Sequence, residues 1–162
     1  MGLFDVLKKK DANSSEDAQK LYTDSLELLE HGRFEEAIKA FDKVIKLDAQ
    51  NAAAWNGKGV ALCALGIHEE AIQALDKAIE LNPNNANTWA NRGLALDHMG
   101  RYEEAIQALD IAVELDPQKA VELIPQRSYA WYGKGQVLGD LERDEEAIQA
   151  YDKAIELDPE YL

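Results

Sequence analysis

The sequence predicts an all-α fold made of stacked pairs of antiparallel helices. Residues 52–85 recur along the chain, and eight positions of this stretch hold the same or similar residues 34 residues later. In residues 52–85 these are repeat positions 4, 8, 11, 15, 20, 24, 27 and 32, which hold Trp55, Gly59, Leu62, Gly66, Ala71, Leu75, Ala78 and Pro83. Helices of about 14 residues are marginal alone in water, so we expect neighbouring copies to stack and to share one apolar core.

Small residues at two repeat positions indicate where the helices of a pair touch. Position 8 is Ser25 in the first copy and glycine in the other three, and position 20 is alanine in all four. A glycine inside a helix costs about 1 kcal/mol relative to alanine. Its recurrence at one helical position therefore indicates that a second helix comes too close for a side chain.

Four copies align in this way, and together they resemble the tetratricopeptide repeat family. The copies are residues 18–51, 52–85, 86–119 and 128–161. The resemblance rests on the period of 34 residues and on the eight repeat positions, and it covers residues 18–162. It implies a right-handed superhelical solenoid of antiparallel helix pairs with a concave face.

Glycine and proline predict where the helices end. Repeat position 15, between the two helices of a pair, is glycine in the first three copies and Glu142 in the fourth, and glycine suits a turn after a helix. Proline at position 32 of the last three copies ends the second helix. The first copy diverges most, with Leu21 in place of tryptophan and Ala49 in place of proline, as terminal copies often do.

Residues 1–17 precede the repeats and form a separate N-terminal segment. Leu3, Phe4, Val6 and Leu7 form a small apolar stripe on a short helix, and three lysines follow. We prefer to interpret the segment as a frayed, disordered terminus. The alternative is an amphipathic anchor that docks on a membrane surface or in an apolar groove of this protein or a neighbour. One of residues 13–15, which all have capping side chains, is expected to begin the first repeat helix.

Residues 120–127 are inserted between the third and fourth repeats. Ala120, Val121 and Ile124 are apolar, and the stretch lacks glycine and turn residues. We therefore predict a short helical insert that ends at Pro125, with an ordinary loop as the alternative. In either case the insert is expected to change how the fourth repeat packs on the third.

The resemblance implies a binding groove, because the first helix of each pair lines the concave face in this family. The side chains at the corresponding positions are mostly amides, tyrosines and apolar groups. Amides both donate and accept hydrogen bonds, so they suit the backbone of a partner peptide or helix. Each residue alone is better explained as a solvated helix position, but the set as a whole favours partner binding. The candidate groove residues are Tyr22, Leu26, Asn56, Val60, Asn87, Asn91, Leu94, His98, Tyr129, Tyr132 and Gln136.

One binding mode of the family is not expected here. Members that hold the acidic C-terminal tails of heat-shock chaperones use a two-carboxylate clamp of lysine, arginine and asparagine side chains. Only Asn91 matches that pattern in this chain, and the cation positions hold Asn56, Tyr129 and Gly133. An acidic tail would therefore meet an acidic protein without cations to pair with. Acidic chaperone tails are not predicted to be partners.

The composition argues against several other classes of function. With 17 basic and 31 acidic residues the formal net charge is −14, which repels nucleic acid. Cys63 is the single cysteine, so the chain has no internal disulfide and suits a reducing compartment. No apolar run approaches the length of a membrane span, and no secretory signal precedes the repeats. We therefore expect a soluble, cytoplasmic protein that does not span a membrane, and docking of the N-terminal segment on a membrane surface stays the less favoured alternative.

The sequence contains no constellation of residues typical of catalysis. His31, His68 and His98 lack cysteine or histidine partners at ligand spacing, so neither a metal site nor a cofactor is expected. Cys63 and His98 can be pictured as a nucleophile and its base. A small buried or groove-lining cysteine explains Cys63 better. We expect no enzymatic activity.

Two functions are compatible with these features. The leading hypothesis is a non-catalytic interaction scaffold that binds a peptide or helix of a partner in the concave groove. The alternative is a self-assembling module, in which copies associate through the C-terminal face or the N-terminal segment. No capping helix follows the fourth repeat, so Ile148, Tyr151, Ile155 and Leu157 are expected to be partly uncovered. Either the chain is a fragment of a longer array, or this end pairs with another molecule, or the exposure is small.

Overall fold

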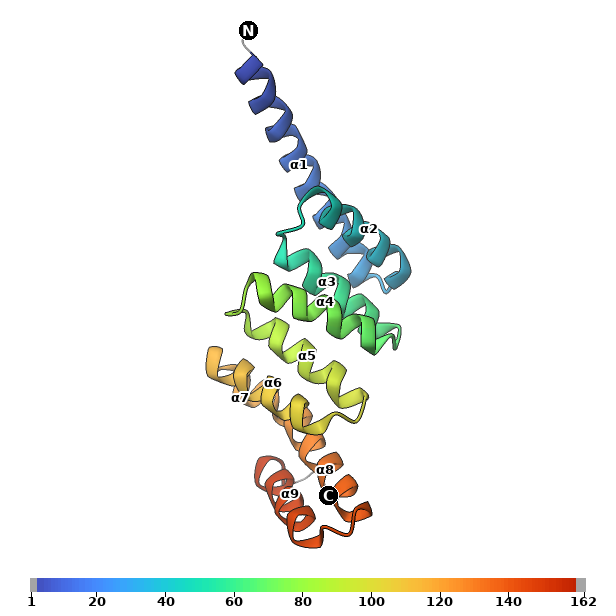
Figure 1. The fold of residues 1–162 in the computed structure, drawn as a ribbon, viewed down its shortest axis with the longest axis vertical. Helices are drawn as coiled ribbons and strands as arrows, with labels where there is room; N and C mark the ends of the chain where they lie inside the picture. The colour runs from blue at the N-terminus through green and yellow to red at the C-terminus, as the bar shows by residue number, and fades with distance from the viewer. Residues whose placement is uncertain (1–2, 160–162) are drawn as a thin grey trace. The chain divides into compact units, whose positions relative to one another are not determined.

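The computed structural model describes the backbone of residues 3–159 and the side chains of residues 17–119 and 122–159 (Figure 1). Within residues 3–159 every regular element is a helix. The helices are α1 (Leu3–Glu30), α2 (Phe34–Leu47), α3 (Ala52–Ala64), α4 (His68–Leu81), α5 (Ala86–His98), α6 (Tyr102–Leu115), α7 (Lys119–Glu122), α8 (Ile124–Asp140) and α9 (Asp144–Leu157). They form two compact units, Met1–Asn82 with α1 to α4 and Pro83–Leu162 with α5 to α9.

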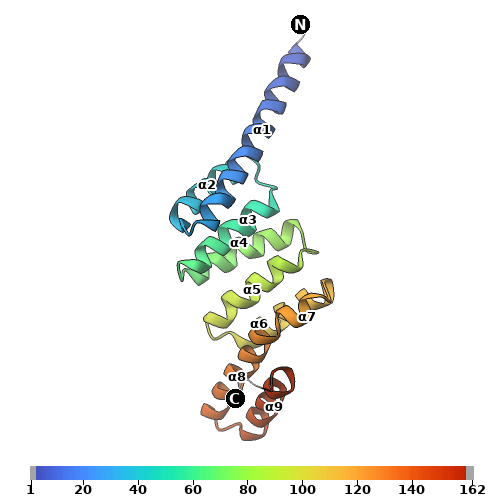
Figure 2. The same ribbon diagram turned by 180° about the vertical axis from the view of Figure 1, so that it is seen from behind.

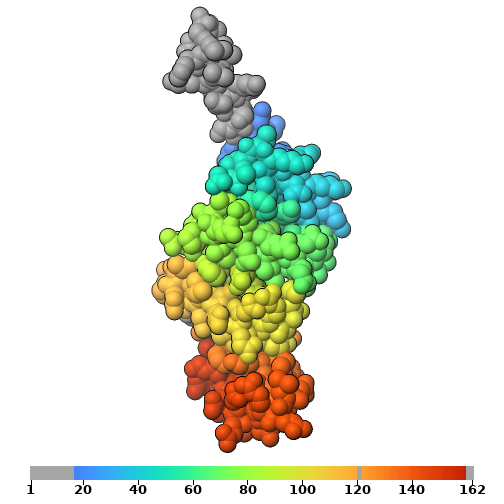
Figure 3. All heavy atoms as spheres, in the orientation of Figure 1, coloured from blue at the N-terminus to red at the C-terminus, as the bar shows by residue number. Residues whose placement is uncertain are grey.

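Each unit contains two of the predicted repeats. In each repeat the two main helices pack side by side in opposite directions, as both ribbon views show (Figures 1 and 2). The pairs are α1 with α2 and α3 with α4 in the first unit, and α5 with α6 and α8 with α9 in the second. The predicted all-α fold of antiparallel helix pairs is therefore confirmed. In Figure 3, where all heavy atoms are drawn as spheres, α3 and α4 are in contact and no open gap separates them on the side shown.

The close contact predicted at repeat position 8 is also confirmed. A Cβ atom added to Gly59 would lie 2.6 Å from Leu75 Cγ, and one added to Gly93 would lie 2.7 Å from Leu109 Cγ. Both leucines are fully buried. The second helix of each pair therefore occupies the space that a side chain at position 8 would need. The residues in this contact are Gly59 with Leu75, Gly93 with Leu109, and Gly135 with Tyr151.

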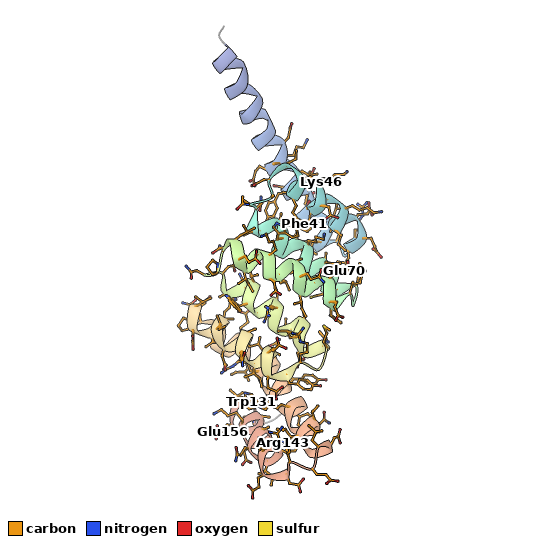
Figure 4. All side chains as sticks on the ribbon, in the orientation of Figure 1. Phe41, Lys46, Glu70, Trp131, Arg143 and Glu156 are labelled. Carbon is orange, nitrogen blue, oxygen red and sulfur yellow. The ribbon has the colours of Figure 1, made fainter. Side chains whose placement is uncertain are left out.

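A second set of glycines lies where one repeat packs on the preceding one. A Cβ atom added to Gly57 on α3 would overlap the ring of Phe41 on α2, and one added to Gly133 on α8 would overlap the ring of Tyr102 on α6. Phe41 is fully buried among the helices of the first unit (Figure 4). The repeat pattern does not predict this contact, because only two of the four copies carry glycine at repeat position 6.

The turns between paired helices need a left-handed residue, as the glycines at repeat position 15 indicate. Gly32, Gly66 and Gly100 have φ angles of 70°, 74° and 70°. Glu142 occupies the same position in the fourth repeat with a φ of 58°. A side chain in this conformation costs roughly 1–2 kcal/mol, a cost that glycine avoids. The fourth turn is therefore strained relative to the other three.

Two side chains fix the start of α3, and the same arrangement recurs at α5. Asn51 Oδ1 accepts a hydrogen bond from the backbone N–H of Ala54 at 2.9 Å, which caps the helix. The indole N–H of Trp55 donates to the carbonyl oxygen of Ala49 at 3.1 Å. The tryptophan at repeat position 4 thereby ties each of these first helices to the chain just before it. At α5, the backbone N–H groups of Asn87 and Thr88 donate to Asn85 Oδ1. The indole N–H of Trp89 donates to the carbonyl oxygen of Pro83.

The first helix does not begin at residues 13–15, so the predicted cap is wrong. α1 runs without a break from Leu3 to Glu30. Most residues before Asn13 are good helix formers, so the helix continues through the capping residues instead of starting at them. The side chains of the predicted apolar stripe (Leu3, Phe4, Val6 and Leu7) are not among those that the structure describes. The docking role of this stripe therefore stays a prediction.

The insert between the third and fourth repeats contains a short helix, as predicted, but Pro125 does not end it. The short helix is α7, and Pro125 lies in the first turn of the next helix, α8. Proline suits this place because the first N–H groups of a helix have no partner within it. α8 therefore has 17 residues, against 13 in α3 and α5. In this added turn, Arg127 Nη2 donates to Asp110 Oδ1 of α6 at 2.8 Å.

The last helix pair leaves apolar side chains uncovered, as predicted. Ile148 is 58% exposed and Ile155 is 40% exposed, while Tyr151 and Leu157 are half-buried. Figure 4 labels Arg143 and Glu156, which lie just before α9 and near its end. None of the helices, as far as their residues are described, is both long and apolar enough to cross a membrane.

Candidate functional site

The candidate groove residues of the first unit lie on its two first helices. Tyr22 and Leu26 on α1 are half-buried, and so are Asn56 and Val60 on α3. Tyr22 packs against Phe41, with ring centroids 6.1 Å apart, and burial raises the pKa of its hydroxyl. Leu26 packs against the same core. Part of the surface that the sequence analysis assigns to the groove is therefore used to stabilise the first repeat.

The second unit holds the other seven candidate residues, and they are more exposed. Asn87, His98, Tyr129 and Gln136 are exposed, whereas Asn91, Leu94 and Tyr132 are half-buried. Tyr132 packs against Tyr151 of α9, with ring centroids 5.4 Å apart. It therefore helps to hold the fourth helix pair together.

Three of these residues line one cavity between α5 and α8. The cavity has a volume of about 350 Å³. Leu94 and His98 of α5 and Tyr129 of α8 are separated in the sequence, and the structure brings them together. Asn87, Asn91, Tyr132 and Gln136 are not part of its lining. The complete lining is Leu94, Asp97, His98, Pro125, Gln126 and Tyr129.

Sequence reasoning alone misses the other half of this cavity. Pro125 and Gln126 belong to the insert, which has no counterpart in the other repeats. Asp97 occupies a first-helix position, and one feature of the sequence separates it from the many other acidic residues. The distinguishing signal was that repeat position 12 is Leu29, Cys63 or Gly139 in the other copies, so Asp97 is its only charged occupant.

Asp97 is a carboxylate in an unfavourable environment. The residue is only 8% exposed, and burial raises the pKa of its carboxyl to about 6, against the lowering effect of His98. Its Oδ1 atom is buried, and none of the described residues donates a hydrogen bond to it. Gln126 Oε1, in the lining of the same cavity, is likewise buried without a donor among the described residues. The cavity thus presents two hydrogen-bond acceptors that the described residues leave unsatisfied.

Three basic side chains on α3 and α8 form ion pairs away from the cavity. Lys58 Nζ of α3 lies 2.7 Å from Asp42 Oδ1 of α2. Lys134 Nζ of α8 lies 3.8 Å from Glu103 Oε1 of α6, and Arg127 pairs with Asp110 of α6. Each cation faces the second helix of the preceding repeat. They tie successive repeats together, and none of them lines the cavity between α5 and α8.

The environments of the residues considered for catalysis can be described one by one. Burial raises the pKa of the Cys63 thiol to about 11, so it stays protonated at neutral pH and is a poor nucleophile. Cys63 lies in the first unit and His98 in the second. In the described part of the chain, histidine, cysteine, aspartate and glutamate side chains form no group of three that could hold a metal ion.

Family models of the tetratricopeptide repeat match most of the chain. One model matches residues 22–86 and 91–161, and a second matches residues 74–107. Together these ranges include residues 22–51 of the first predicted repeat, the other three repeats and the insert. No curated protein matches the sequence.

Solved structures of tetratricopeptide repeat proteins resemble the whole fold. A crystal structure of MamA protein is 26% identical with a TM-score of 0.71, and the match covers 94% of this chain and 79% of MamA. MamA 41-end from Desulfovibrio magneticus RS-1 is 25% identical with a TM-score of 0.64, covering 89% of this chain and 77% of that one. The TPR2B domain of yeast Sti1, in a complex with pHsp70, is 25% identical with a TM-score of 0.67, covering 70% and 94%.

Proposed function

The chain belongs to the tetratricopeptide repeat family, and from this membership we propose that it is a non-catalytic scaffold that binds a segment of a partner protein. The observation that carries the proposal is the cavity between α5 and α8, where Leu94, His98 and Tyr129 meet. Pre-formed helices hold these side chains in place, so little ordering is needed when a partner binds. The partner segment would lie on the first helices, in contact with apolar and tyrosine side chains and with asparagine amides. We place this function in the cytoplasm.

The resemblance to a domain in complex with pHsp70 supports peptide binding in general. The details differ, because the clamp for acidic tails needs cations where this chain has Asn56, Tyr129 and Gly133. Gly133 also packs under the ring of Tyr102, so a long basic side chain has no room there. We therefore propose a partner other than an acidic chaperone tail.

Titration of a peptide library against the protein tests this function. A dissociation constant in the micromolar range, which corresponds to a binding free energy of about −8 kcal/mol, would be ordinary for such a groove. We expect the double variant Asn56→Ala with Asn91→Ala to bind the selected peptides at least about tenfold more weakly, since each lost polar contact contributes about 1 kcal/mol. The matched control is Gln107→Ala with Gln149→Ala, because both glutamines are exposed on second helices. Equal binding by the two double variants would contradict the assignment of the groove.

Exposed apolar side chains on α9 favour self-assembly as a second candidate function. Ile148 and Ile155 are exposed and lie seven residues apart, so they face the same side of the helix. Sedimentation of the full chain, of residues 16–162 and of Ile148→Asp with Ile155→Asp tests this function. If α9 mediates assembly, only the isoleucine variant is monomeric; if the N-terminal segment does, only the shortened chain is. A monomer for the full chain would argue against assembly.

A further inference from the structure

The cavity between α5 and α8 contains two buried acceptors with no matching donor in the part of the chain that the structure describes. Asp97 Oδ1 comes from α5 and Gln126 Oε1 from the first turns of α8, and neither receives a hydrogen bond from the described residues. A buried acceptor without a donor is costly, because water no longer solvates it. The arrangement is therefore suited to a ligand that brings donors into the cavity.

The charge of the site indicates what kind of donor fits. Asp97 carries the only carboxylate among the lining residues, and none of them is lysine or arginine. The basic residues on α8, Arg127 and Lys134, pair with α6 instead. The whole chain has a formal net charge of −14, so a cation is attracted to the protein before it reaches the cavity.

The remaining lining fits the aliphatic part of a long basic side chain. Leu94 and Pro125 are apolar, and Tyr129 is 49% exposed at the cavity, where it offers an aromatic ring. The methylene stem of lysine packs on apolar surface while its ammonium group reaches polar partners. The ammonium group has three N–H donors and no acceptor, which complements two unsatisfied oxygens.

We propose that this cavity binds a lysine side chain of an extended partner segment, whose ammonium group donates hydrogen bonds to Asp97 Oδ1 and Gln126 Oε1. The proposal rests on the proposed function and specifies its partner, since it selects segments with a lysine at the position that reaches α5 and α8. The insert is part of the site, because it supplies Pro125 and Gln126. A charge-assisted hydrogen bond in a buried place is stronger than a neutral one, so this one residue would set much of the specificity.

The binding should depend on pH, because only the ionised carboxylate attracts the ammonium group. The titratable groups that face Asp97 are His98 on α5, Tyr102 on α6 and Tyr129 on α8. The pKa of Asp97 is raised to about 6, so the carboxylate is mostly ionised at pH 7 and mostly protonated at pH 5. Binding is therefore expected to be about tenfold weaker at pH 5 than at pH 7. His98 is the neighbouring titratable group on α5, so the His98→Gln variant is used to assign the pH dependence to Asp97.

The test uses three small probes on the full chain: the N-acetyl methylamides of lysine, arginine and norleucine. Norleucine has the same stem as lysine but no charge, so it measures the apolar contribution alone. Backbone amide shifts at Leu94, Asp97, Gln126 and Tyr129 are followed by NMR as each probe is added. We expect the lysine probe to bind at least tenfold more tightly than the norleucine probe, and the His98→Gln variant to keep the pH dependence.

Two variants assign the effect to Asp97. We expect Asp97→Asn to bring the affinity for the lysine probe to that of the norleucine probe. The control is Asp152→Asn, which changes the net charge equally at an exposed residue of α9 outside the cavity and should change the affinity by less than twofold. Thermal unfolding of both variants checks that they fold.

The outcomes separate this proposal from the proposed function. Equal affinity for lysine and norleucine probes would overturn it, and would mean that water satisfies the two oxygens. Tighter binding of arginine than of lysine would also overturn it in favour of a guanidinium site. If library peptides still bind and depend on Asn56 and Asn91 but show no preference for lysine, only this proposal fails. If no peptide binds while the lysine probe still depends on Asp97, only the proposed function fails.

Discussion

The two units place different side chains at the same helical position, and this difference has chemical consequences. Repeat position 12 is Cys63 in the first unit and Asp97 in the second, and burial raises the pKa of both side chains. The thiol, with a pKa of about 11, stays neutral in the folded protein, whereas the carboxyl, with a pKa of about 6, is mostly ionised at neutral pH. The same helical position thus carries an uncharged side chain at Cys63 and a mostly ionised one at Asp97, which attracts cations.

The rest of the scaffold is closely matched in the two units. Gly59 with Leu75 and Gly93 with Leu109 make the same contact, to within 0.1 Å in the distance from an added Cβ atom to leucine Cγ (2.6 and 2.7 Å). The units differ in the insert, which adds α7 and lengthens α8 in the second. The chemical difference at repeat position 12 therefore comes from one side chain, and the insert adds Pro125 and Gln126 beside it, so variants can test each part.

The largest expected effect tests whether the two cores are equivalent. Leu75→Ala and Leu109→Ala should each lower the free energy of unfolding by about 2–5 kcal/mol, because each removes a fully buried side chain. Urea denaturation measures the loss. Ile148→Ala, at an exposed residue, should cost less than about 0.5 kcal/mol. A loss confined to one of the two leucines would show that the matched contacts are not energetically matched.

A smaller effect is expected where the paired helices touch. Gly59→Ala and Gly93→Ala should each destabilise the protein by about 1–3 kcal/mol, because the new methyl group overlaps a leucine. Gly139→Ala is the control in α8, since nothing lies within 4 Å of an added Cβ atom. That substitution should leave stability unchanged or raise it by up to about 1 kcal/mol. Thermal denaturation of the three variants would show whether packing or helix propensity determines the change in stability when glycine is replaced by alanine.

Exchange of the side chains at repeat position 12 should reverse the difference between the units. Asp97→Asn should raise the free energy of unfolding at pH 7 by about 1–2 kcal/mol, because it removes a buried charge that has no donor. Cys63→Asp should lower it by a similar amount, because it places a carboxylate in the corresponding half-buried position. The pair of measurements contradicts the comparison if both substitutions change stability in the same direction.

The Asp97→Asn variant also tests how the effect of Asp97 on the free energy of unfolding depends on pH. The pKa of Asp97 is about 6 in the folded protein and near its ordinary value of 3.8 in the unfolded chain. The folded state therefore binds more protons between these two values, so Asp97 costs nothing below pH 3.8 and its cost grows until the pH passes about 6. We expect the stability advantage of Asp97→Asn over the wild type to grow from pH 4 to pH 6 and then stay constant. Urea denaturation at a series of pH values measures this advantage; an advantage that shrinks over the window would show that the carboxyl is not destabilised by burial.

The smallest expected effect concerns the strained turn of the last helix pair. Glu142→Gly should stabilise the protein by about 0.5–1 kcal/mol, because φ is 58° at this residue and glycine adopts that angle without a steric cost. Gly100→Ala introduces the reverse change at the equivalent turn, where φ is 70°, and should destabilise by about 1 kcal/mol. Differential scanning calorimetry of both variants compares the turns, and a loss of stability in Glu142→Gly would mean that the glutamate side chain outweighs the strain.

The repeats, the helix pairs, the close contact at position 8 and the left-handed turn at position 15 all follow from the sequence. These follow from local rules, because a missing side chain or a left-handed turn must recur wherever the same backbone geometry recurs. The cap at residues 13–15 and the end of a helix at Pro125 were wrong for the opposite reason. Capping residues and prolines each suit more than one place in a helix, and the neighbouring chain decides which one is used.

The candidate site depends on how the helices pack. Leu94, His98 and Tyr129 are first-helix residues that the repeat pattern selects, but the pattern does not bring them to one cavity. Asp97 and Gln126 become significant only because packing of α8 beside α5 removes water from their oxygens and supplies no donor in return. Burial arises only when the helices of a unit pack together. The repeat pattern therefore predicts the helices, whereas the packing between them produces the buried oxygens of the candidate site.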